Sequence, residues 1–208
     1  MAITVHHLEN SRSQRILWML EELGLPYDVK RYERDRRTML APPELKAIHP
    51  LGKSPILDHD GRIVAETATI VEYLVAIADG RLGPPDDADG ALRWRYFLDY
   101  AEGSLMPPLL LSLVIGKMGP FGWPARGFVT KFAMTHIDYV ESELSQRPWF
   151  AGADFTAADI MMSFPLEAAR SRAGLDESRP RIIDWLERIH ARPAYGAALA
   201  KGGPYAYA

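Results

Sequence analysis

The hydrophobic pattern changes near residue 80, and this change constrains the fold more than any other feature of the sequence. Before it, strand-like and helix-like segments alternate in the order βαβ, helix, ββα. Residues 81–89 are rich in Gly, Pro and Asp, have no apolar pattern, and are followed by no further strand signal. The sequence therefore predicts an α/β domain over residues 1–80, a linker over 81–89 and an all-helical domain over 90–208.

Connections within the first domain predict the directions of its strands. The predicted strands cover residues 3–8, 27–32, 55–58 and 62–65, and the predicted helices cover 14–23, 43–48 and 67–78. A helix joins the first two strands, so these two strands must run parallel. Asp60-Gly61 is a two-residue hairpin signal between the last two, which must therefore be antiparallel.

The second half of the chain is expected to be helical throughout. Predicted helices cover residues 91–113 (with a bend at Pro107-Pro108), 128–144, 156–173, 181–191 and 194–200, and residues 118–127 are predicted to be a loop. Thr156 and Asp159 have the spacing of a capping box, in which each side chain binds a backbone N–H of the other's turn. This motif predicts a helix start and not a catalytic group.

Composition excludes several classes of function. The chain has 208 residues, a formal net charge of -3 and no cysteine. Without cysteine there is no disulfide, no Cys–zinc site and no protein thiol nucleophile. The mild acidity argues against nucleic acid as a partner. The N-terminus has no signal-peptide pattern and the most apolar stretch, residues 105–115, is too short to span a bilayer, so we expect a cytoplasmic protein without membrane contact.

Three short motifs in the first domain carry residue types suited to binding and catalysis. Residues 10–15, Asn-Ser-Arg-Ser-Gln-Arg, lie where the first strand gives way to a helix, a common position for an anionic ligand. Ser54-Pro55 opens the third strand, and its X–Pro bond can be cis. Glu66 and Thr67 begin the next helix and together suit an α-amino acid head group. Each motif has a structural alternative: a helix cap, an edge-strand proline and a capping pair.

Taken together, the motifs ENSRSQR, HPLGKSP and AETATIVEYL, in this order and at these spacings, resemble the glutathione S-transferase family. The resemblance covers nearly the whole chain, including the segment FTAADI in the helical half. It implies a thioredoxin-like N-terminal domain followed by a helical bundle. The run SRSQRILWMLEELGLPY is similar to bacterial and fungal members that use a serine.

The resemblance also assigns roles in binding glutathione, the expected co-substrate. Ser11 matches the catalytic serine that stabilises the thiolate, and Ser13, Asn10 and Arg12 are its competitors. The other matches are the backbone of Ser54 before the cis-proline Pro55, the γ-glutamyl pair Glu66 and Thr67, the glycyl-end candidates Lys53 and His49, and Glu102 (or, less well, Asp99) reaching across a homodimer. No metal is expected, since Asp58, His59 and Asp60 fit no zinc or calcium spacing.

The second substrate is expected to be a hydrophobic electrophile. Candidate contacts are the cluster Met118, Phe121, Trp123 and Phe128, with Tyr100 and Met106 on the opposite wall. Core packing is the alternative for these residues. The implied activity is conjugation of glutathione, with reduction of organic hydroperoxides as a possible second reaction. Glutathione-dependent isomerisation or dehalogenation, and a non-catalytic glutathione-binding or scaffold role, are the alternatives.

Overall fold

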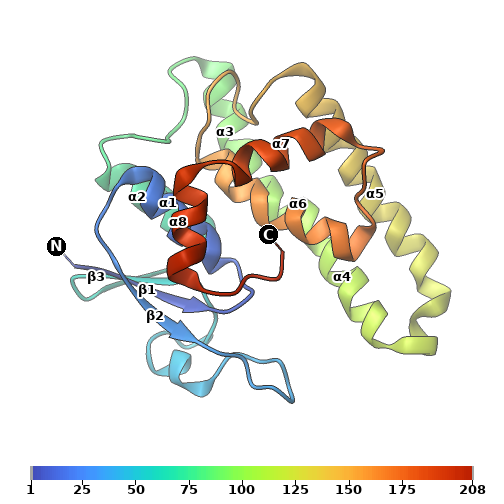
Figure 1. The fold of residues 1–208 in the computed structure, drawn as a ribbon, viewed down its shortest axis with the longest axis horizontal. Helices are drawn as coiled ribbons and strands as arrows, with labels where there is room; N and C mark the ends of the chain where they lie inside the picture. Colours follow the sequence, from blue (N-terminus) through green and yellow to red (C-terminus); the bar gives the residue numbers. More distant parts are fainter. Residues whose placement is uncertain (1, 208) are drawn as a thin grey trace. The chain divides into compact units, whose positions relative to one another are not determined.

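The computed structural model describes residues 2–207 and divides into two compact units. One unit is formed by Met1–Gly83 together with His190–Ala208, and the other by Pro84–Ile189. Figure 1 shows that the strands belong to the N-terminal part of the chain and that the remainder is helical. The predicted fold class, a thioredoxin-like α/β part followed by a helical part, is confirmed.

The first unit contains a four-stranded mixed sheet with the order β2-β1-β3-β4. Its elements are β1 (Ile3–Leu8), α1 (Ser13–Leu23), β2 (Asp28–Tyr32), η1 (Pro43–Ala47), β3 (Ile56–His59), β4 (Arg62–Ala65), α2 (Thr67–Ile77) and α8 (Pro193–Gly202). As predicted, β1 and β2 are parallel and β3 and β4 are antiparallel. Asp60 and Gly61 both have positive φ, 51° and 85°, which is the conformation of a two-residue hairpin turn.

Helix α1 forms the centre of this unit. Nine of its eleven residues are buried, and it contacts β1, α2 and α8. Gly24 ends it in the left-handed conformation, with φ of 61°, as the sequence predicted. This burial is too extensive for a surface helix, and it arises because α1 packs against α2 and α8 as well as against β1.

Helix α8 belongs to the first unit. The sequence prediction instead included residues 190–208 in the all-helical domain. Arg192 donates two hydrogen bonds to the carboxylate of Glu22, at 2.5 and 2.8 Å. Lys201 pairs with Glu21 at 2.7 Å, and the rings of Trp18 and Tyr195 meet edge to face at 5.2 Å. The expected boundary of 90–208 therefore differs from the structure at its C-terminal end, because α8 binds α1 through contacts between distant parts of the chain.

The second unit consists of helices. They are α3 (Ala88–Tyr100), η2 (Ala101–Leu105), α4 (Met106–Lys117), η3 (Gly119–Gly122), α5 (Trp123–Gln146), α6 (Ala157–Ala173) and α7 (Pro180–His190). The element η2 is a turn of π-helix directly before Pro107-Pro108. Proline cannot donate an N–H and its ring displaces a carbonyl of the preceding turn, which accounts for the wider turn at this point.

The predicted loop over residues 118–127 is wrong. Residues 119–122 form the short helix η3, and α5 already begins at Trp123. The glycines, prolines and aromatic residues of 118–127 are the reason that the sequence predicted a loop there. Pro124 instead occupies the first turn of α5, where a missing backbone N–H costs nothing because that N–H would have no helical partner.

Helix α6 begins with the predicted capping box. The carboxylate of Asp159 accepts the Thr156 N–H at 3.0 Å, and the Thr156 hydroxyl accepts the Ala158 N–H at 3.3 Å. Asp159 also accepts the N–H of Phe150 at 3.1 Å and the indole N–H of Trp185 at 3.2 Å. The cap of α6 therefore also connects α6 to α7 and to the segment before it.

Helices α3, η2 and α4 form one continuous helical run of 30 residues, longer than the apolar stretch considered from the sequence. By length and composition alone this run could cross a membrane, with a mean hydropathy of 1.2 over its most apolar window. Of that window, 44% is buried inside the protein. The run is weak evidence for a membrane span.

Candidate active site

The register of the sheet brings the three sequence motifs of the first unit to one end of the sheet. His6 on β1 pairs with Ile56 on β3, and Ile56 pairs with Ala65 on β4. Along the chain, residues 10–15 follow the end of β1, Ser54-Pro55 immediately precedes Ile56, and Glu66-Thr67 immediately follows Ala65. Motifs up to 57 residues apart in sequence (Asn10 to Thr67) therefore gather beside one row of paired residues.

Ser11 lies in the junction between β1 and α1 and is part of a buried chain of hydrogen bonds. Its Oγ is 2.7 Å from Ser13 Oγ and accepts the Ser13 N–H at 3.2 Å. Ser13 Oγ is in turn 2.8 Å from Nδ1 of His7. Ser13 is fully buried, whereas Ser11 retains 6% of its surface. The capping alternative is thus partly realised, since Ser11 accepts an N–H of the first turn.

His7 determines the direction of these hydrogen bonds. Its ring binds the backbone of Gly202 as well as Ser13. Burial, followed by the nearby charge of Arg31, lowers the pKa of His7 to about 4, so the ring is neutral near pH 7. With Nε2–H donated to the Gly202 carbonyl, Nδ1 is an acceptor and receives the Ser13 hydroxyl. Ser13 then cannot donate to Ser11, and the Ser11 hydroxyl hydrogen turns toward Ser13.

The other two competitors for the catalytic role differ in what the structure shows. The side-chain oxygen of Asn10, a residue with φ of 49°, accepts the N–H of Ala206 at 2.7 Å. Arg12 is the capping residue at the start of α1 and makes no side-chain cap. Arg34 stabilises the same junction by donating to the carbonyl of Glu9 at 3.3 Å. Of the two serine hydroxyls in this junction, Ser11 retains access to the surface and Ser13 does not.

The Ser54-Pro55 peptide bond is cis, as the sequence allowed. The Ser54 hydroxyl donates to the His6 carbonyl at 2.8 Å and accepts the Leu8 N–H at 3.2 Å. The side chain is thus used to attach this loop to β1. Lys53 is exposed beside it, and His49 is partly exposed in the preceding turn, where its Nδ1 accepts the Leu51 N–H at 3.4 Å.

Glu66 and Thr67 differ strongly in exposure. Thr67 is buried, with 5% of its surface accessible, and is the first residue of α2. Glu66 is exposed and has φ of 68°, a conformation that residues other than glycine seldom adopt. Such a backbone costs about 1–3 kcal/mol and is concentrated at functional positions. The strain is consistent with a binding role for this pair.

The six residues predicted to contact a hydrophobic substrate fall into two groups in the second unit. Tyr100 and Met106 are buried, and the Tyr100 hydroxyl is 2.8 Å from Nδ1 of His136. Core packing, the alternative reading, therefore describes these two. The other four are exposed: Met118 to 49%, Phe121 to 86%, Trp123 to 63% and Phe128 to 73% of their surfaces. Glu102 lies partly exposed in η2, and its predicted role across a dimer stays a prediction.

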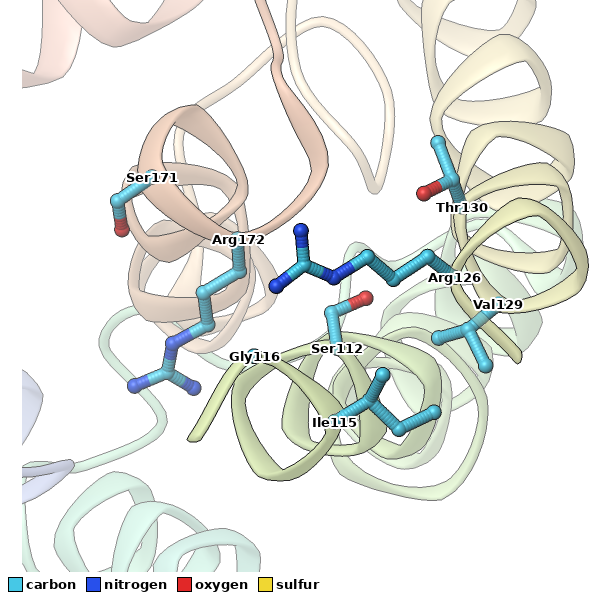
Figure 2. Close-up of a pocket in the computed structure, with 8 residues that line it drawn as sticks. All are labelled: Ser112, Ile115, Gly116, Arg126, Val129, Thr130, Ser171 and Arg172. Atoms are coloured by element: carbon cyan, nitrogen blue, oxygen red, sulfur yellow. The ribbon is translucent and has the colours of Figure 1, made fainter. Parts of the chain in front are cut away.

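Sequence reasoning missed two features. No local motif marks His7 for a role, and as neighbours in a strand His6 and His7 are expected to face opposite sides of the sheet. The structure confirms the opposite orientation, with His6 bound to the Tyr32 hydroxyl at 2.9 Å and His7 bound to Ser13. A pocket in the helical unit, lined by Arg126 and Arg172 among others, was also missed and contains none of the six predicted substrate residues (Figure 2). Within residues 2–207, no group of three or more His, Asp or Glu side chains could hold a metal ion.

The neutral state of His7 predicts a pH dependence of stability. The pKa of His7 is about 4 in the folded protein and about 6.5 in an unfolded chain. The unfolded state therefore binds more protons between these values, so stability from this group is present above about pH 6.5 and is lost as pH falls toward 4. When the pH is lowered from 7 to 5, the unfolding free energy of the wild type is expected to fall about 2 kcal/mol further than that of His7→Gln.

Urea unfolding at the two pH values measures this difference. His49→Gln, which replaces a partly exposed histidine of the same unit, is the control and is expected to show the wild-type pH dependence. A His7→Gln variant with an unchanged pH dependence would show that His7 does not titrate differently in the folded state.

The mixed sheet, the cis-proline and the helical second unit define the class of thioredoxin-like proteins that carry an all-helical unit. Two family models match the chain, the N-terminal domain of glutathione S-transferase over residues 11–77 and the C-terminal domain over residues 133–188.

Individual relatives agree with the family models. The chain is 36% identical to glutathione S-transferase 1 of Saccharomyces cerevisiae, over 96% of this chain and 94% of the relative. It is 38% identical to glutathione S-transferase 3 of Schizosaccharomyces pombe, over 96% and 87%. A crystal structure of a glutathione S-transferase from Actinobacillus pleuropneumoniae has a TM-score of 0.88 at 34% identity, covering 99% of this chain and 95% of that one. The chain belongs to the glutathione S-transferase family.

Proposed function

We propose that this protein is a glutathione transferase that activates the thiol of glutathione with Ser11 and transfers it to hydrophobic electrophiles. The observation that carries the proposal is the position of Ser11. It lies in the junction between β1 and α1 in a buried hydrogen-bond chain, and it keeps access to the surface. This junction is at the same end of the sheet as the cis-proline loop and the Glu66-Thr67 pair. The names of the relatives, glutathione S-transferases over nearly their whole lengths, support glutathione as co-substrate.

Only a modest free energy is required of the site. A free thiol has a pKa of about 8.5, so lowering it by about two units requires roughly 2.7 kcal/mol. One or two hydrogen bonds to the charged sulfur supply that amount. Ser11 provides the first when its hydroxyl turns from Ser13 to the sulfur, since a thiolate is a stronger acceptor than a neutral hydroxyl. The Ser13 N–H keeps Ser11 Oγ in place throughout.

Chemistry then takes place on the sulfur of glutathione. The thiolate attacks an electrophilic carbon, forms a carbon–sulfur bond and expels the leaving group with its electron pair. With an organic hydroperoxide, the thiolate attacks oxygen instead, the O–O bond breaks, and a second glutathione completes the reduction to the alcohol, water and glutathione disulfide. Since the protein has no cysteine, it forms no mixed disulfide with glutathione. Exposed aromatic residues around Phe121 and Trp123 are the proposed apolar contacts for the electrophile.

Head-group recognition is assigned to Glu66 and Thr67, with the Ser54 backbone before Pro55 on the cysteinyl unit and Lys53 or His49 near the glycyl carboxylate. Thr67 begins α2, and this position suits a carboxylate because the first N–H groups of a helix have no helical partner. The exposed carboxylate of Glu66 suits an ammonium group.

A homodimer, completed by Glu102 of the second copy, and a cytoplasmic location belong to the same proposal. Glutathione binding without turnover would favour the scaffold alternative.

A glutathione titration followed by the difference absorbance of the thiolate across pH tests this function. Saturable binding with a thiol pKa below about 7.5 is expected, since the free thiol has a pKa of about 8.5. Binding with an unshifted pKa would point to a glutathione-binding protein without thiol activation. No binding would reject the proposal.

Thr67→Ala is expected to weaken glutathione binding by about five- to twentyfold, because the γ-glutamyl carboxylate loses a hydrogen-bond donor. Isothermal titration with glutathione measures the change. Thr69→Ala, at an exposed position of the same helix, is the matched control and is expected to bind as the wild type does. Equal affinities for all three proteins would mean that the γ-glutamyl group lies elsewhere.

A further inference from the structure

An apolar surface open to solvent lies on α4 and α5, the two neighbouring helices that η3 joins (Figure 1). Six of its side chains expose between 42% and 86% of their surfaces. Apolar residues scattered singly on a protein surface are ordinary, whereas a contiguous group of them marks an interaction site. We call this surface the α4–α5 face and define it by Val114, Met118, Phe121, Trp123, Phe128 and Phe132.

Helical periodicity places the exposed residues of α4 and α5 on one side of the helix pair. The residues that line the space shared with α6 are Ser112 and Gly116 on α4, and Arg126 and Thr130 on α5 (Figure 2). Each of these four is followed, two positions later, by a residue of the α4–α5 face. Two positions correspond to about 200° around a helix, so the face points away from α6 on both helices.

The charged groups around the α4–α5 face are all positive. Between Glu102 and Asp138 the sequence has no acidic residue, and its charged residues are Lys117, Arg126 and Lys131. Both lysines are exposed, and neither makes an ion pair with any residue in the described range 2–207. Each lysine directly precedes a residue of the face, about 100° away around its helix, so the two lysines flank the face. The chain as a whole has a net charge of -3, so this positive charge is local.

Trp123, at the first residue of α5, adds a group that suits a boundary between apolar and aqueous surroundings. Its side chain is 63% exposed, and its indole N–H makes no hydrogen bond to any other residue that the structure describes. Tryptophan has an apolar ring and one polar N–H, and it is enriched at the interface between a bilayer and water for this reason. Phe121, two positions earlier, is 86% exposed.

Exposed aromatic residues combined with flanking lysines are typical of surfaces that bind anionic membranes. We propose that the α4–α5 face docks on the surface of an anionic lipid bilayer, with its aromatic side chains among the acyl chains and with Lys117 and Lys131 at the head groups. A second copy of this chain fits less well, because a two-fold contact would bring the same lysines together without an acidic residue of this segment to pair with them.

Docking of this kind leaves both helices along the bilayer surface, and no helix spans it. The expectation of a protein without membrane contact considered spanning segments and signal peptides, and an exposed docking face is a separate feature. The proposal does not rest on the proposed glutathione chemistry. It does place the protein where hydrophobic electrophiles concentrate.

Co-sedimentation with phosphatidylcholine vesicles, prepared with and without phosphatidylserine, tests the proposal. The samples contain no glutathione and no electrophile, so a failure of the glutathione proposal would leave this result unaffected. We expect the protein to bind the phosphatidylserine vesicles at least about tenfold more tightly, because each lysine near the anionic surface adds to the attraction. Added salt is expected to weaken this binding, because it screens the charges.

Fluorescence identifies the part of the protein that enters the bilayer. The emission of the wild type is expected to shift to shorter wavelengths on binding, because Trp123 leaves water. Trp123→Phe keeps an apolar aromatic side chain, and it is expected to bind within about threefold of wild type while losing the shift. A shift of wild-type size in Trp123→Phe would contradict the proposed orientation.

Variants then locate the docking face. Phe128→Ser is expected to weaken binding about tenfold, and the double variant Lys117→Gln, Lys131→Gln to remove most of the preference for phosphatidylserine. Leu92→Ser, which replaces a 70% exposed leucine on α3, is the matched control and is expected to stay within about twofold of wild type.

Sedimentation velocity without vesicles, on the wild type and Phe128→Ser, tests for a second copy as the occupant of the face. The proposal is overturned if the protein does not bind phosphatidylserine vesicles or binds both kinds of vesicle equally. It is also overturned if Leu92→Ser weakens binding as much as Phe128→Ser, or if Phe128→Ser changes the oligomeric state and leaves vesicle binding unchanged.

Discussion

Replacing Ser11 with alanine is expected to raise the pKa of the thiol of bound glutathione by about one unit or more, with little loss of glutathione affinity. The variant removes the hydroxyl that would donate a hydrogen bond to the thiolate. The contacts proposed for the tripeptide at Glu66 and Thr67 are left intact. Difference absorbance of the bound thiolate across pH measures the shift. Since less thiolate is present below the new pKa, conjugation of an activated aryl halide near pH 6.5 is expected to fall about tenfold or more.

Ser13→Ala distinguishes a role of Ser11 from a general disturbance of the junction. Ser11 Oγ and Ser13 Oγ are 2.7 Å apart, and we infer that Ser11 is the donor because Ser13 donates to His7. Removing the Ser13 hydroxyl takes away an acceptor that competes with the sulfur, so the thiol pKa is expected to stay the same or to fall. If both variants raise the pKa equally, the two serines act as one unit and Ser11 is not the separate donor proposed here.

Replacing Asp159 with alanine is expected to lower the free energy of unfolding by about 3–5 kcal/mol. The side chain is fully buried and accepts hydrogen bonds from Thr156, Phe150 and Trp185. Alanine leaves these donors buried without a partner, and each such loss costs about 1–3 kcal/mol. Urea unfolding measures the effect. Asp154→Ala, at an exposed position in the preceding loop, is the control and is expected to change stability by less than about 0.5 kcal/mol.

Asp159 also gives this measurement a pH signature. Burial raises the pKa of Asp159 to about 6, although its hydrogen bonds with Thr156, Phe150 and Trp185 oppose the shift. In an unfolded chain the pKa is about 3.9, so between these values the folded state binds more protons. The stability from protonated Asp159 is therefore present below about pH 4 and is lost as pH rises through about 6. The destabilisation by Asp159→Ala is expected to be smaller at pH 7 than at pH 4, and the opposite trend would contradict the raised pKa.

Local patterns were sufficient where the determining interaction lies within a few residues. Asp60-Gly61 predicted the hairpin because both positions need positive φ, and Thr156 with Asp159 predicted the start of α6 because a capping box is completed within one turn. Gly24 ended α1 for the same kind of reason. The order of the elements and the parallel or antiparallel sense of the strand pairs followed from these local patterns and from the length of the connections.

The candidate glutathione site was predictable only in part. The positions of the serine, cis-proline and Glu-Thr motifs came from their resemblance to a family, and the sheet register explains why they meet. No local pattern pairs His7 with Ser13, because their bond depends on how β1 and α1 pack and on the backbone of Gly202. The sequence could not assign α8 to the first unit for the same reason. The hydrogen-bonded residues Arg192 and Glu22 are 170 positions apart in the chain.

By itself, then, the sequence determined most of the elements, their order, the fold class and the motifs, because these depend on backbone preferences and side-chain periodicity over short distances. Tertiary structure alone decided which hydroxyl stays accessible, which histidine orients it, which predicted substrate residues are core, and where Arg126, Arg172 and Ser112 form a pocket. These outcomes depend on packing between segments far apart in the chain. The identity of a residue does not specify its burial or its partners until those segments meet.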